Sequence, residues 1–209
     1  MEQEVKLTAP DGDTLEQISL DADILKRCNG APWTAKPLVT TYLDTPGRAL
    51  LAHGFGFRFR IETQTQRWQA CLKGEGNIVD GFSVRQEWEQ PIDGPVDRLS
   101  LLPEGPLRQQ VLTLAPGGEF LAPLVETAFL RRLLLLTLEE GCIMELALDQ
   151  GEIRAGGKTL PLFEVELECK SGPTAPMLRF SHALRQRYPL IPSWTSKFAL
   201  GLTLLTPRP

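Results

Sequence analysis

The sequence predicts a mainly β fold of the α+β class, in which an antiparallel sheet or barrel has helices packed outside it. β-branched and aromatic residues alternate with polar ones in short segments that end at Gly, Pro, Asn or Asp, as in half-buried strands. Helical spacing interrupts this series instead of alternating with it, which disfavours a parallel βαβ sheet. At 209 residues, 42% of them hydrophobic, the chain can bury one domain core.

Eight segments carry the strand pattern: residues 2–8, 38–43, 55–64, 67–73, 82–90, 127–138, 142–149 and 161–170. Helices are expected at three sets of apolar residues: Leu15, Ile18 and Leu25 behind an Asp13-x-x-Glu16 capping box; Leu107, Val111 and Leu114; and Met177, Leu184 and Tyr188. The domain is expected to span residues 1–203, with a tail or linker over residues 204–209.

Composition excludes several classes of protein. Lys and Arg total 22 against 26 Asp and Glu, so a net charge of −4 gives no overall field to attract nucleic acid or an anionic membrane. The four cysteines form no Cys-x-x-Cys pair, which argues against a thiolate metal cluster. The N-terminus lacks an apolar signal core, and no apolar run is long enough to span a bilayer. We therefore expect a cytoplasmic protein in which any anion site is local.

One face of nearly every predicted strand is charged. Side chains two residues apart on a strand share a face, so Glu2, Glu4 and Lys6 point together. The same alternation groups Arg58 with Arg60 and Glu62, Arg85 with Glu87 and Glu89, Glu145 with Asp149, and Glu164 with Glu166, Glu168 and Lys170.

These charged faces have two interpretations. They could be a solvated surface with cross-strand ion pairs, each of which contributes little. Like-charged neighbours such as Arg58 and Arg60 argue against this, because they repel unless counter-ions lie among them. The alternative is a closed barrel with its charged faces inward, where carboxylates would hold Mg²⁺ or Mn²⁺ and basic residues would bind a multi-phosphate anion.

Other motifs carry less information. The segment Gly156-Gly157-Lys158-Thr159 is similar to the end of a P-loop, but it lies between two strands, and Glu152 stands where the motif needs Gly. A hairpin turn is the better interpretation. With only two histidines and no GxSxG motif, a catalytic triad is not expected.

A series of motifs resembles the signature of the CYTH superfamily, the triphosphate tunnel metalloenzymes. The motifs are Glu2-x-Glu4-x-Lys6, Tyr42-Leu43-Asp44-Thr45-Pro46, Phe57-Arg58-Phe59-Arg60, Leu72-Lys73-Gly74, Arg85-Gln86-Glu87, Arg131, Glu145 with Asp149, Glu164-Val165-Glu166-Leu167-Glu168, and Ser196-Lys197. Each alone is weak, but their order across residues 2–202 is specific. The resemblance implies an eight-stranded antiparallel closed barrel that forms a charged tunnel, with helices packed outside and room for two divalent metals.

The resemblance is strongest to bacterial inorganic triphosphatases in which this domain often precedes a helical CHAD domain, so such a domain is a possible partner if this chain is an N-terminal part. It implies an enzyme that hydrolyses inorganic triphosphate to pyrophosphate and phosphate with Mg²⁺ or Mn²⁺. The expected substrate-binding residues are Lys6, Arg58, Arg60, Lys73, Arg85, Arg131 and Lys197. The expected metal ligands are Glu2, Glu4, Glu164, Glu166 and Glu145, of which Glu2, Glu4 and Glu166 would hold the metal that bridges the phosphates. Glu168, Glu87 and Asp149 are the expected catalytic residues, which would position water or a second metal.

Three alternatives use the same anion site. A class IV adenylate cyclase, or a nucleoside or thiamine triphosphatase, would need a pocket for an organic group, which the sequence does not show. A non-catalytic polyphosphate-binding module would be expected to lack the metal carboxylates. Phe57, Phe59 and Trp88 alternate away from the charged faces, so they should lie outside the tunnel. This favours inorganic triphosphate or short polyphosphate over a nucleotide.

Overall fold

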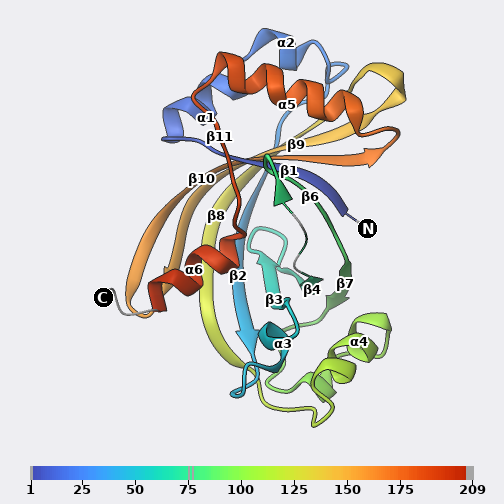
Figure 1. Cartoon of the computed structure of the whole chain (residues 1–209), viewed down its shortest axis with the longest axis vertical. Coiled ribbons are helices and arrows are strands. Elements are labelled where there is room, and N and C mark those ends of the chain that lie inside the picture. Colours follow the sequence, from blue (N-terminus) through green and yellow to red (C-terminus); the bar gives the residue numbers. More distant parts are fainter. Residues whose placement is uncertain (1, 75, 77, 206–209) are drawn as a thin grey trace.

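The computed structural model describes residues 2–74, 76 and 78–205, and these form one strongly curled antiparallel sheet with helices outside it (Figure 1). The strands are β1 (Glu2–Thr8), β2 (Thr34–Asp44), β3 (Phe55–Glu62), β4 (Arg67–Gly74), β5 (Ile78–Val79), β6 (Phe82–Arg85), β7 (Glu87–Ile92), β8 (Ala122–Thr137), β9 (Ile143–Ala155), β10 (Lys158–Ser171) and β11 (Ile191–Pro192). Their order in the sheet is β5-β6-β1-β10-β9-β8-β2-β3-β4-β7, and β11 also pairs with β1. The predicted mainly β class is confirmed.

The two ends of the sheet meet in one stretch of chain. β6 pairs with β1, β7 pairs with β4, and only Gln86 separates β6 from β7. The Gln86 carbonyl accepts a hydrogen bond from the backbone N–H of Gly74 at 3.0 Å. The single strand predicted over residues 82–90 is therefore two strands, and with the two-residue strands β5 and β11 the eight expected strands become eleven within the described residues.

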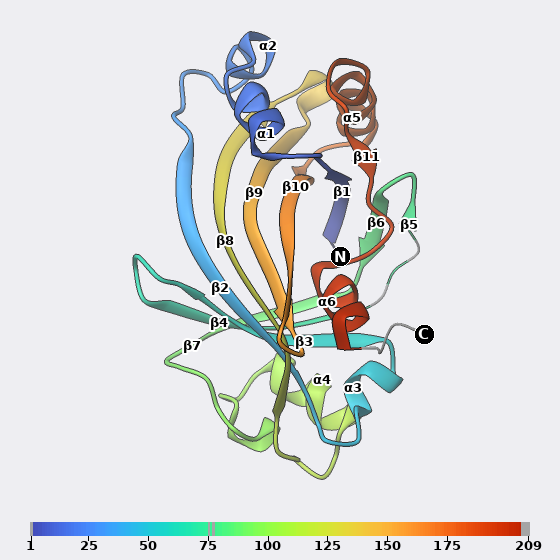
Figure 2. The same ribbon diagram turned by 90° about the vertical axis from the view of Figure 1, so that its left-hand side faces the viewer.

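The long strands are longer than predicted. β2 begins at Thr34 and passes through Pro37, and β8 begins at Ala122 and passes through Pro123. Proline usually marks a strand end because it cannot donate to the ladder, so the sequence pattern placed these starts too late. Figure 2 shows β2, β8, β9 and β10 curving side by side along one wall, with β3 and β4 crossing near one end of that wall.

Helices cover the outer face at both ends, and the last of them along the chain packs against the inner face. They are α1 (Gly12–Ser19), α2 (Ala22–Leu25), α3 (Ala49–Ala52), α4 (Pro106–Leu114), α5 (Ala175–Arg187) and α6 (Lys197–Leu205), with 3₁₀ turns at Leu99–Leu101 and Glu139–Gly141. The group α1, α2 and α5 lies at the opposite end of the molecule from α3 and α4 (Figure 1). None of the helices in the described residues has the length and apolarity needed to cross a membrane.

The predicted start of the first helix is wrong. Asp11 caps α1, and its side chain accepts a hydrogen bond from the Thr14 backbone N–H at 2.8 Å. A second aspartate, Asp21, then caps α2, so the apolar residues expected in one helix are divided between two. The predicted helices at 107–114 and 177–188 are confirmed as α4 and α5.

The sequence pattern missed α6 because its apolar residues alternate. Phe198, Leu200, Leu202 and Leu204 are two residues apart, which is a strand period. The helix continues to Leu205 and so includes the first two residues of the expected tail. Residues 206–209 of that tail lie outside the described residues.

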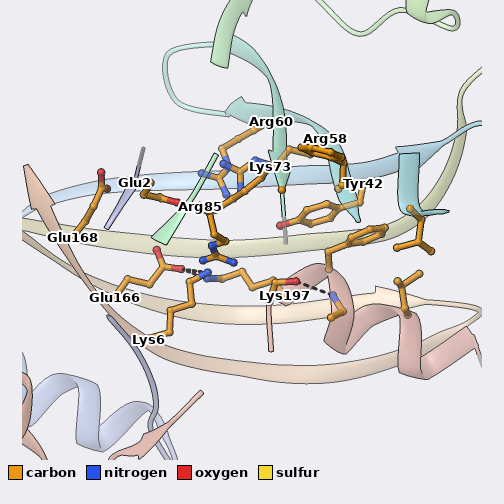
Figure 3. A pocket seen from close by; sticks show the side chains of 18 of the residues that line it. Glu2, Lys6, Tyr42, Arg58, Arg60, Lys73, Arg85, Glu166, Glu168 and Lys197 are labelled. Atoms are coloured by element: carbon orange, nitrogen blue, oxygen red, sulfur yellow. Dashed lines mark hydrogen bonds and ion pairs between the residues drawn. The ribbon is translucent and has the colours of Figure 1, made fainter. Parts of the chain in front are cut away.

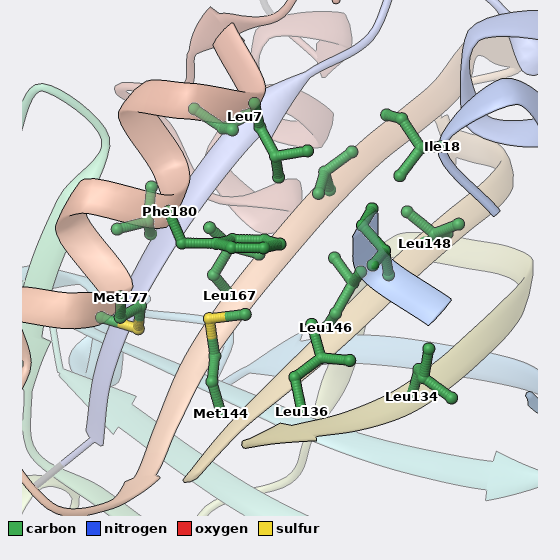
Figure 4. Packing of buried hydrophobic residues seen from close by; sticks show 14 of the residues in the cluster. Leu7, Ile18, Leu134, Leu136, Met144, Leu146, Leu148, Leu167, Met177 and Phe180 are labelled. Carbon is green, nitrogen blue, oxygen red and sulfur yellow. The ribbon is translucent and has the colours of Figure 1, made fainter. Parts of the chain in front are cut away.

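Apolar clusters surround the charged interior. One fills the space between the sheet and the helices α1 and α5, and it includes Leu7, Ile18, Met144 and Phe180 (Figure 4). A second, with Phe57 and Phe59 almost fully buried and Trp88 packed against it, lies with residues of α3 and α4. The prediction that these three aromatics point away from the charged faces agrees with this packing.

A third apolar cluster lies inside the curled sheet. It joins Tyr42, Phe129 and Phe198, among others, and it includes residues of α6. Phe129 is two residues before Arg131 on β8, so both side chains share the inward face. The charged side chains of the interior therefore pack against an apolar layer that includes residues of α6.

The Gly-Gly-Lys-Thr segment is the predicted hairpin turn. Gly156 and Gly157 have φ values of 56° and 73° and join β9 to β10. Two consecutive residues with positive φ match the type I′ turn that favours glycine in tight hairpins. The Lys158 ammonium donates to the Leu204 carbonyl of α6 at 3.0 Å and so binds protein instead of forming a phosphate loop.

Gly151 supplies a test of how closely β8 and β9 pack. A Cβ atom at this position would lie 2.1 Å from the Ala128 carbonyl oxygen and 2.5 Å from the Phe129 Cα. We expect Gly151→Ala to lower the free energy of unfolding by at least about 2 kcal/mol, because only a backbone shift relieves the clash. Gly47→Ala is the control, since nothing lies within 4 Å of its added Cβ. Urea denaturation that shows equal stability for the two variants would contradict this packing.

Candidate active site

The inward strand faces enclose two adjoining cavities. The first is lined by Glu2, Lys6, Tyr42, Leu51, Phe55, Gly56, Arg58, Arg60, Lys73, Gly74, Arg85, Arg131, Glu166, Glu168, Ser196, Lys197, Phe198, Ala199 and Leu202 (Figure 3). All seven residues predicted to bind substrate are in this lining. The second cavity shares Glu2, Arg58, Arg60, Arg131 and Glu168 with the first. The two cavities are therefore parts of one tunnel.

Strand register brings residues that are distant in sequence into this tunnel. Lys6 lies opposite Glu166 in the β1–β10 ladder, and Arg131 lies opposite Asp149 in the β8–β9 ladder. Lys73 lies opposite Glu87 in the β4–β7 ladder. Residues opposite each other in antiparallel strands point to the same side of the sheet, so basic and acidic residues meet on the inner face.

The predicted acidic residues divide into three groups. Glu2, Glu166 and Glu168 line the first cavity, whereas Glu87 and Glu145 line only the second. Glu4, Glu164 and Asp149 line neither cavity and are at most 2% exposed, behind the basic side chains. The roles assigned to these eight carboxylates stay predictions.

One buried ion-pair network links β8, β9, β10 and α6. Arg131 donates Nε and Nη2 to the two Asp149 oxygens at 2.7 and 2.6 Å, and Nη2 also reaches Glu166 at 2.5 Å. Lys197 Nζ lies 2.9 Å from Asp149 and 2.8 Å from Glu166, and it also contacts Glu164. Burial alone would raise the pKa of Asp149 and of Glu166, but Arg131 and Lys197 hold the first below its usual value and the second well below. Burial raises the pKa of Glu164.

A second network surrounds β1. Glu4 contacts Arg85 and lies 3.4 Å from both Lys73 Nζ and Lys6 Nζ. Lys6 Nζ is also 3.4 Å from Glu166, so this ammonium joins the carboxylates of β1 and β10. Burial alone would lower the pKa of Lys6, but the attraction of Glu166 and other acidic neighbours raises it.

Among the residues that the structure describes, two groups of side chains bring possible metal-ligand atoms within 4.8 Å of one another. The group Asp149, Glu164 and Glu166 offers carboxylate oxygens only, the donors that Mg²⁺ and Mn²⁺ prefer. Lys197 contacts the same three carboxylates, so a cation bound there would compete with its ammonium.

The other group is Cys71, Glu87 and Glu89. Burial raises the pKa of the Cys71 thiol to about 12, so the thiol stays protonated at neutral pH and is a poor ligand for a hard cation. Glu2 and Glu4, which were expected to share a metal with Glu166, belong to neither group.

The sequence reasoning missed three aromatic residues of the tunnel. Tyr42, Phe55 and Phe198 line the first cavity, and the Tyr42 and Phe198 rings stack with centroids 4.9 Å apart. Burial alone would raise the Tyr42 pKa, but Arg58, Arg60 and Lys197 lower it. Tyr42 opens one of the motifs quoted from the sequence and could have been found there, whereas Phe198 could not be placed without α6.

The Asp44-Thr45-Pro46 motif has a structural role here. The Asp44 carboxylate accepts hydrogen bonds from the backbone N–H groups of Thr45, Leu50 and Leu51 at 2.7 to 3.0 Å. The Thr45 hydroxyl accepts one from Ala49 N–H at 3.0 Å. These bonds satisfy the free donors at the start of α3 and fix the turn that leads from β2 to β3.

Lys197 supplies a test of the buried network. We expect Lys197→Met to lower the free energy of unfolding by about 3 kcal/mol at pH 8, because Asp149, Glu164 and Glu166 lose a shared positive partner. Without the ammonium, Arg131 still pairs with Asp149 and Glu166, but the pKa of Glu164, which burial already raises, rises further above its unfolded value. Folding then takes up protons, so the loss should shrink between pH 8 and pH 5.

In the wild-type protein, by contrast, the stability that Asp149 and Glu166 contribute should decrease as the pH is lowered. The lowered folded-state pKa values of Asp149 and Glu166 stabilise it above their usual values of 3.8 and 4.5, and that stability is lost as the pH falls below them. Urea denaturation at each pH measures both effects. Lys158→Met is the control, because Lys158 is exposed and its ammonium donates to the Leu204 backbone carbonyl, away from the buried carboxylates. A pH-independent loss in Lys197→Met would contradict the network.

Among curated proteins, the chain is 31% identical over 171 residues to the inorganic triphosphatase of Haemophilus influenzae. This match covers 80% of the chain but only 46% of the relative, so the chain spans about half the length of that protein.

Solved structures share the fold. A candidate adenylyl cyclase from Hippeastrum, described as having a dominant triphosphatase activity, superimposes with a TM-score of 0.71 at 22% identity over 100% of this chain and 98% of that chain. The PH1819 protein from Pyrococcus horikoshii gives a TM-score of 0.58 at 17% identity over 96% of this chain and 99% of that chain. The sequence also matches the CYTH domain over residues 1–198, and the chain therefore belongs to the CYTH domain family.

Proposed function

We propose that this chain hydrolyses inorganic triphosphate to pyrophosphate and phosphate in a reaction that depends on Mg²⁺ or Mn²⁺. The observation that carries the proposal is that seven basic side chains from six different elements line one cavity of a protein whose net charge is −4. Such a local concentration of buried positive charge suits a small, highly charged anion. The similarity to the Haemophilus inorganic triphosphatase supports the same substrate.

The basic residues would bind the phosphates and stabilise the charge that moves to the leaving oxygen. In-line positioning and charge neutralisation supply most of the catalysis in phosphoryl transfer, so no nucleophilic side chain is needed. Glu2, Glu4 and Glu166 would hold one metal ion, with Glu164 and Glu145 as ligands of a second. When bound, the metal would neutralise phosphate oxygens and lower the pKa of a bound water.

Glu87 and Glu168 remain the proposed groups for positioning the attacking water, since each lines a cavity. Asp149 lines neither, and both of its oxygens accept from Arg131. We infer that Asp149 orients Arg131 instead of touching water. A cytoplasmic location and a neighbouring CHAD domain stay predictions.

Glu4→Gln tests the proposed metal site. The change keeps the size of the side chain but removes ligand charge, so we expect phosphate release from tripolyphosphate to fall at least about 100-fold in the presence of Mg²⁺ or Mn²⁺. The thermal midpoint should fall as well, because Glu4 is buried against Arg85, Lys73 and Lys6. Glu126→Gln is the matched control, since Glu126 pairs with Arg154 on the outer surface. EDTA should stop the wild-type reaction, and added metal should restore it.

Normal turnover in Glu4→Gln would show that the Glu4 carboxylate is not a ligand of the metal. Metal-independent turnover by the wild type would reject the metal part of the proposal. Tight tripolyphosphate binding with no turnover under any divalent metal would favour the non-catalytic polyphosphate-binding module.

Hydrolysis of an organic triphosphate is the second candidate, and one observation favours it. Tyr42, Phe55 and Phe198 give the first cavity an apolar side that the sequence did not predict. The Tyr42 and Phe198 rings are nearly parallel, with 10° between their planes, and stack on each other. Each ring therefore has one face already covered, which leaves less aromatic surface for a base.

We therefore expect tripolyphosphate to be cleaved at least about tenfold more efficiently than ATP, because the basic residues contact phosphate whereas adenine gains little to offset its ordering cost. Phosphate release under identical metal conditions gives kcat/KM for each substrate. Comparable values would move the proposal to a nucleoside triphosphatase. Formation of cyclic AMP would move it to the cyclase branch.

A further inference from the structure

Arg60 differs from the other basic residues of the tunnel. Among the described residues, the other six each have a carboxylate oxygen within 4.0 Å. The pairs are Lys6 with Glu4 and Glu166, Arg58 with Glu87 and Glu89, Lys73 with Glu2, Glu4 and Glu87, Arg85 with Glu4, Arg131 with Asp149 and Glu166, and Lys197 with Asp149, Glu164 and Glu166. Within the same residues, Arg60 has no such partner.

Two uncharged side chains hold Arg60 instead. Its Nε donates to the Thr40 hydroxyl at 3.0 Å, and its guanidinium carbon lies 5.7 Å from the centre of the Phe129 ring. Thr40 is directly opposite Arg60 in the β2–β3 ladder, and Phe129 comes from β8 on the other side of β2. Both are at most 5% exposed and neither lines a cavity, whereas Arg60 lines both.

The surroundings of Arg60 disfavour its charge. Burial, Arg58 and Arg131 lower its pKa to about 10, against the weaker opposing effects of Tyr42 and Asp149. The negative face of an aromatic ring attracts a cation, and that attraction strengthens when water is excluded. Phe129 therefore favours the charged form of a guanidinium whose acidic neighbours are already paired with other bases.

We propose that Thr40 and Phe129 are positioning residues that hold Arg60 charged and directed into the tunnel, where it makes the first contact with a triphosphate anion. This inference rests on the proposed function. A phosphate that binds any of the other six cations must compete with a carboxylate, but a phosphate that binds Arg60 displaces none. Figure 3 shows Arg60 directed toward the same space as Arg58, Lys73 and Arg85, so the first contact would lie among further cations.

Two variants test the inference, each with a matched control. Phe129→Leu removes the ring but keeps an apolar side chain, and Phe59→Leu makes the same change in the apolar cluster outside the tunnel. Thr40→Val removes the hydroxyl that accepts from Arg60. Thr127→Val is its control, because Thr127 lies opposite Thr40 in the β2–β8 ladder and its buried hydroxyl has no partner among the described residues.

We expect Phe129→Leu and Thr40→Val to raise the KM for tripolyphosphate by about threefold to thirtyfold, with kcat within about twofold of wild type, since they weaken binding and leave the reacting groups in place. Each control should keep its KM within about twofold, even though Phe59→Leu lowers the melting temperature. Phe129→Tyr, which keeps the aromatic ring, should retain the wild-type KM more closely than Phe129→Leu does.

The centre of the Phe129 ring also lies 5.7 Å from the Arg131 guanidinium carbon and 5.4 Å from Lys197 Nζ. A double-mutant cycle therefore tests which of these basic residues Phe129 acts through. If Phe129 acts through Arg60, Phe129→Leu should change KM little in an Arg60→Ala background. An undiminished effect there would overturn the inference, and so would a wild-type KM in both Phe129→Leu and Thr40→Val.

Calorimetric titration of tripolyphosphate without metal separates this inference from the proposed function. If the wild type binds tripolyphosphate but releases no phosphate with any metal, the proposed function fails. Weaker binding by Phe129→Leu than by wild type would then still support the role of the ring. Equal binding by the two proteins would overturn that role, whether or not the wild type is a triphosphatase.

Discussion

The structure depends on enclosing many charges inside a curled sheet without leaving them uncompensated. The seven basic residues of the tunnel face the eight carboxylates predicted to act beside them, so the interior is close to neutral although it holds many charged side chains. An unpaired buried charge costs several kcal/mol, and a mismatch of even a few charges would consume the stability of a domain of this size. Strand register provides the match, because it places Lys6 opposite Glu166, Lys73 opposite Glu87 and Arg131 opposite Asp149.

Such an interior gives little net stability, because the attraction within each buried ion pair mostly offsets the cost of removing the two charges from water. The apolar clusters must therefore stabilise the fold. Two of them lie outside the sheet, beneath helices, which explains why the strands carry apolar residues on the face opposite the charges. The third lies inside, beneath the charged layer, and it provides the dry surface against which the bases are held.

Strand alternation is the part of this arrangement that the sequence states most directly. Alternation puts Arg131 and Arg132 on opposite faces of β8, and in the structure Arg131 lines the tunnel whereas Arg132 pairs with Glu16 of α1. Alternation cannot show how deeply a side chain is buried: it assigned both Asp149 and Glu166 to charged faces, although Asp149 is buried behind Arg131 and Glu166 lines the cavity. Alternation also cannot show which strands pair. Gln86 interrupts the predicted strand between Arg85 and Glu87, so that β6 pairs with β1 whereas β7 pairs with β4.

The largest gap between sequence and structure is α6, and it shows how a tertiary contact overrides a local pattern. Its Phe-x-Leu-x-Leu-x-Leu alternation favours a strand, and a lysine in the first turn is unfavourable for a helix because the helix dipole places positive charge there. Two interactions outweigh these preferences. The Ser196 hydroxyl accepts a hydrogen bond from the Ala199 N–H at 3.1 Å, which caps the first turn, and the carboxylates of β9 and β10 surround Lys197. The same contacts that allow the helix to start also place Lys197 in the tunnel and Phe198 against Tyr42. One set of ion pairs thus stabilises the start of α6 and also places its side chains in the tunnel. A change to those carboxylates would therefore alter both the helix and the tunnel lining.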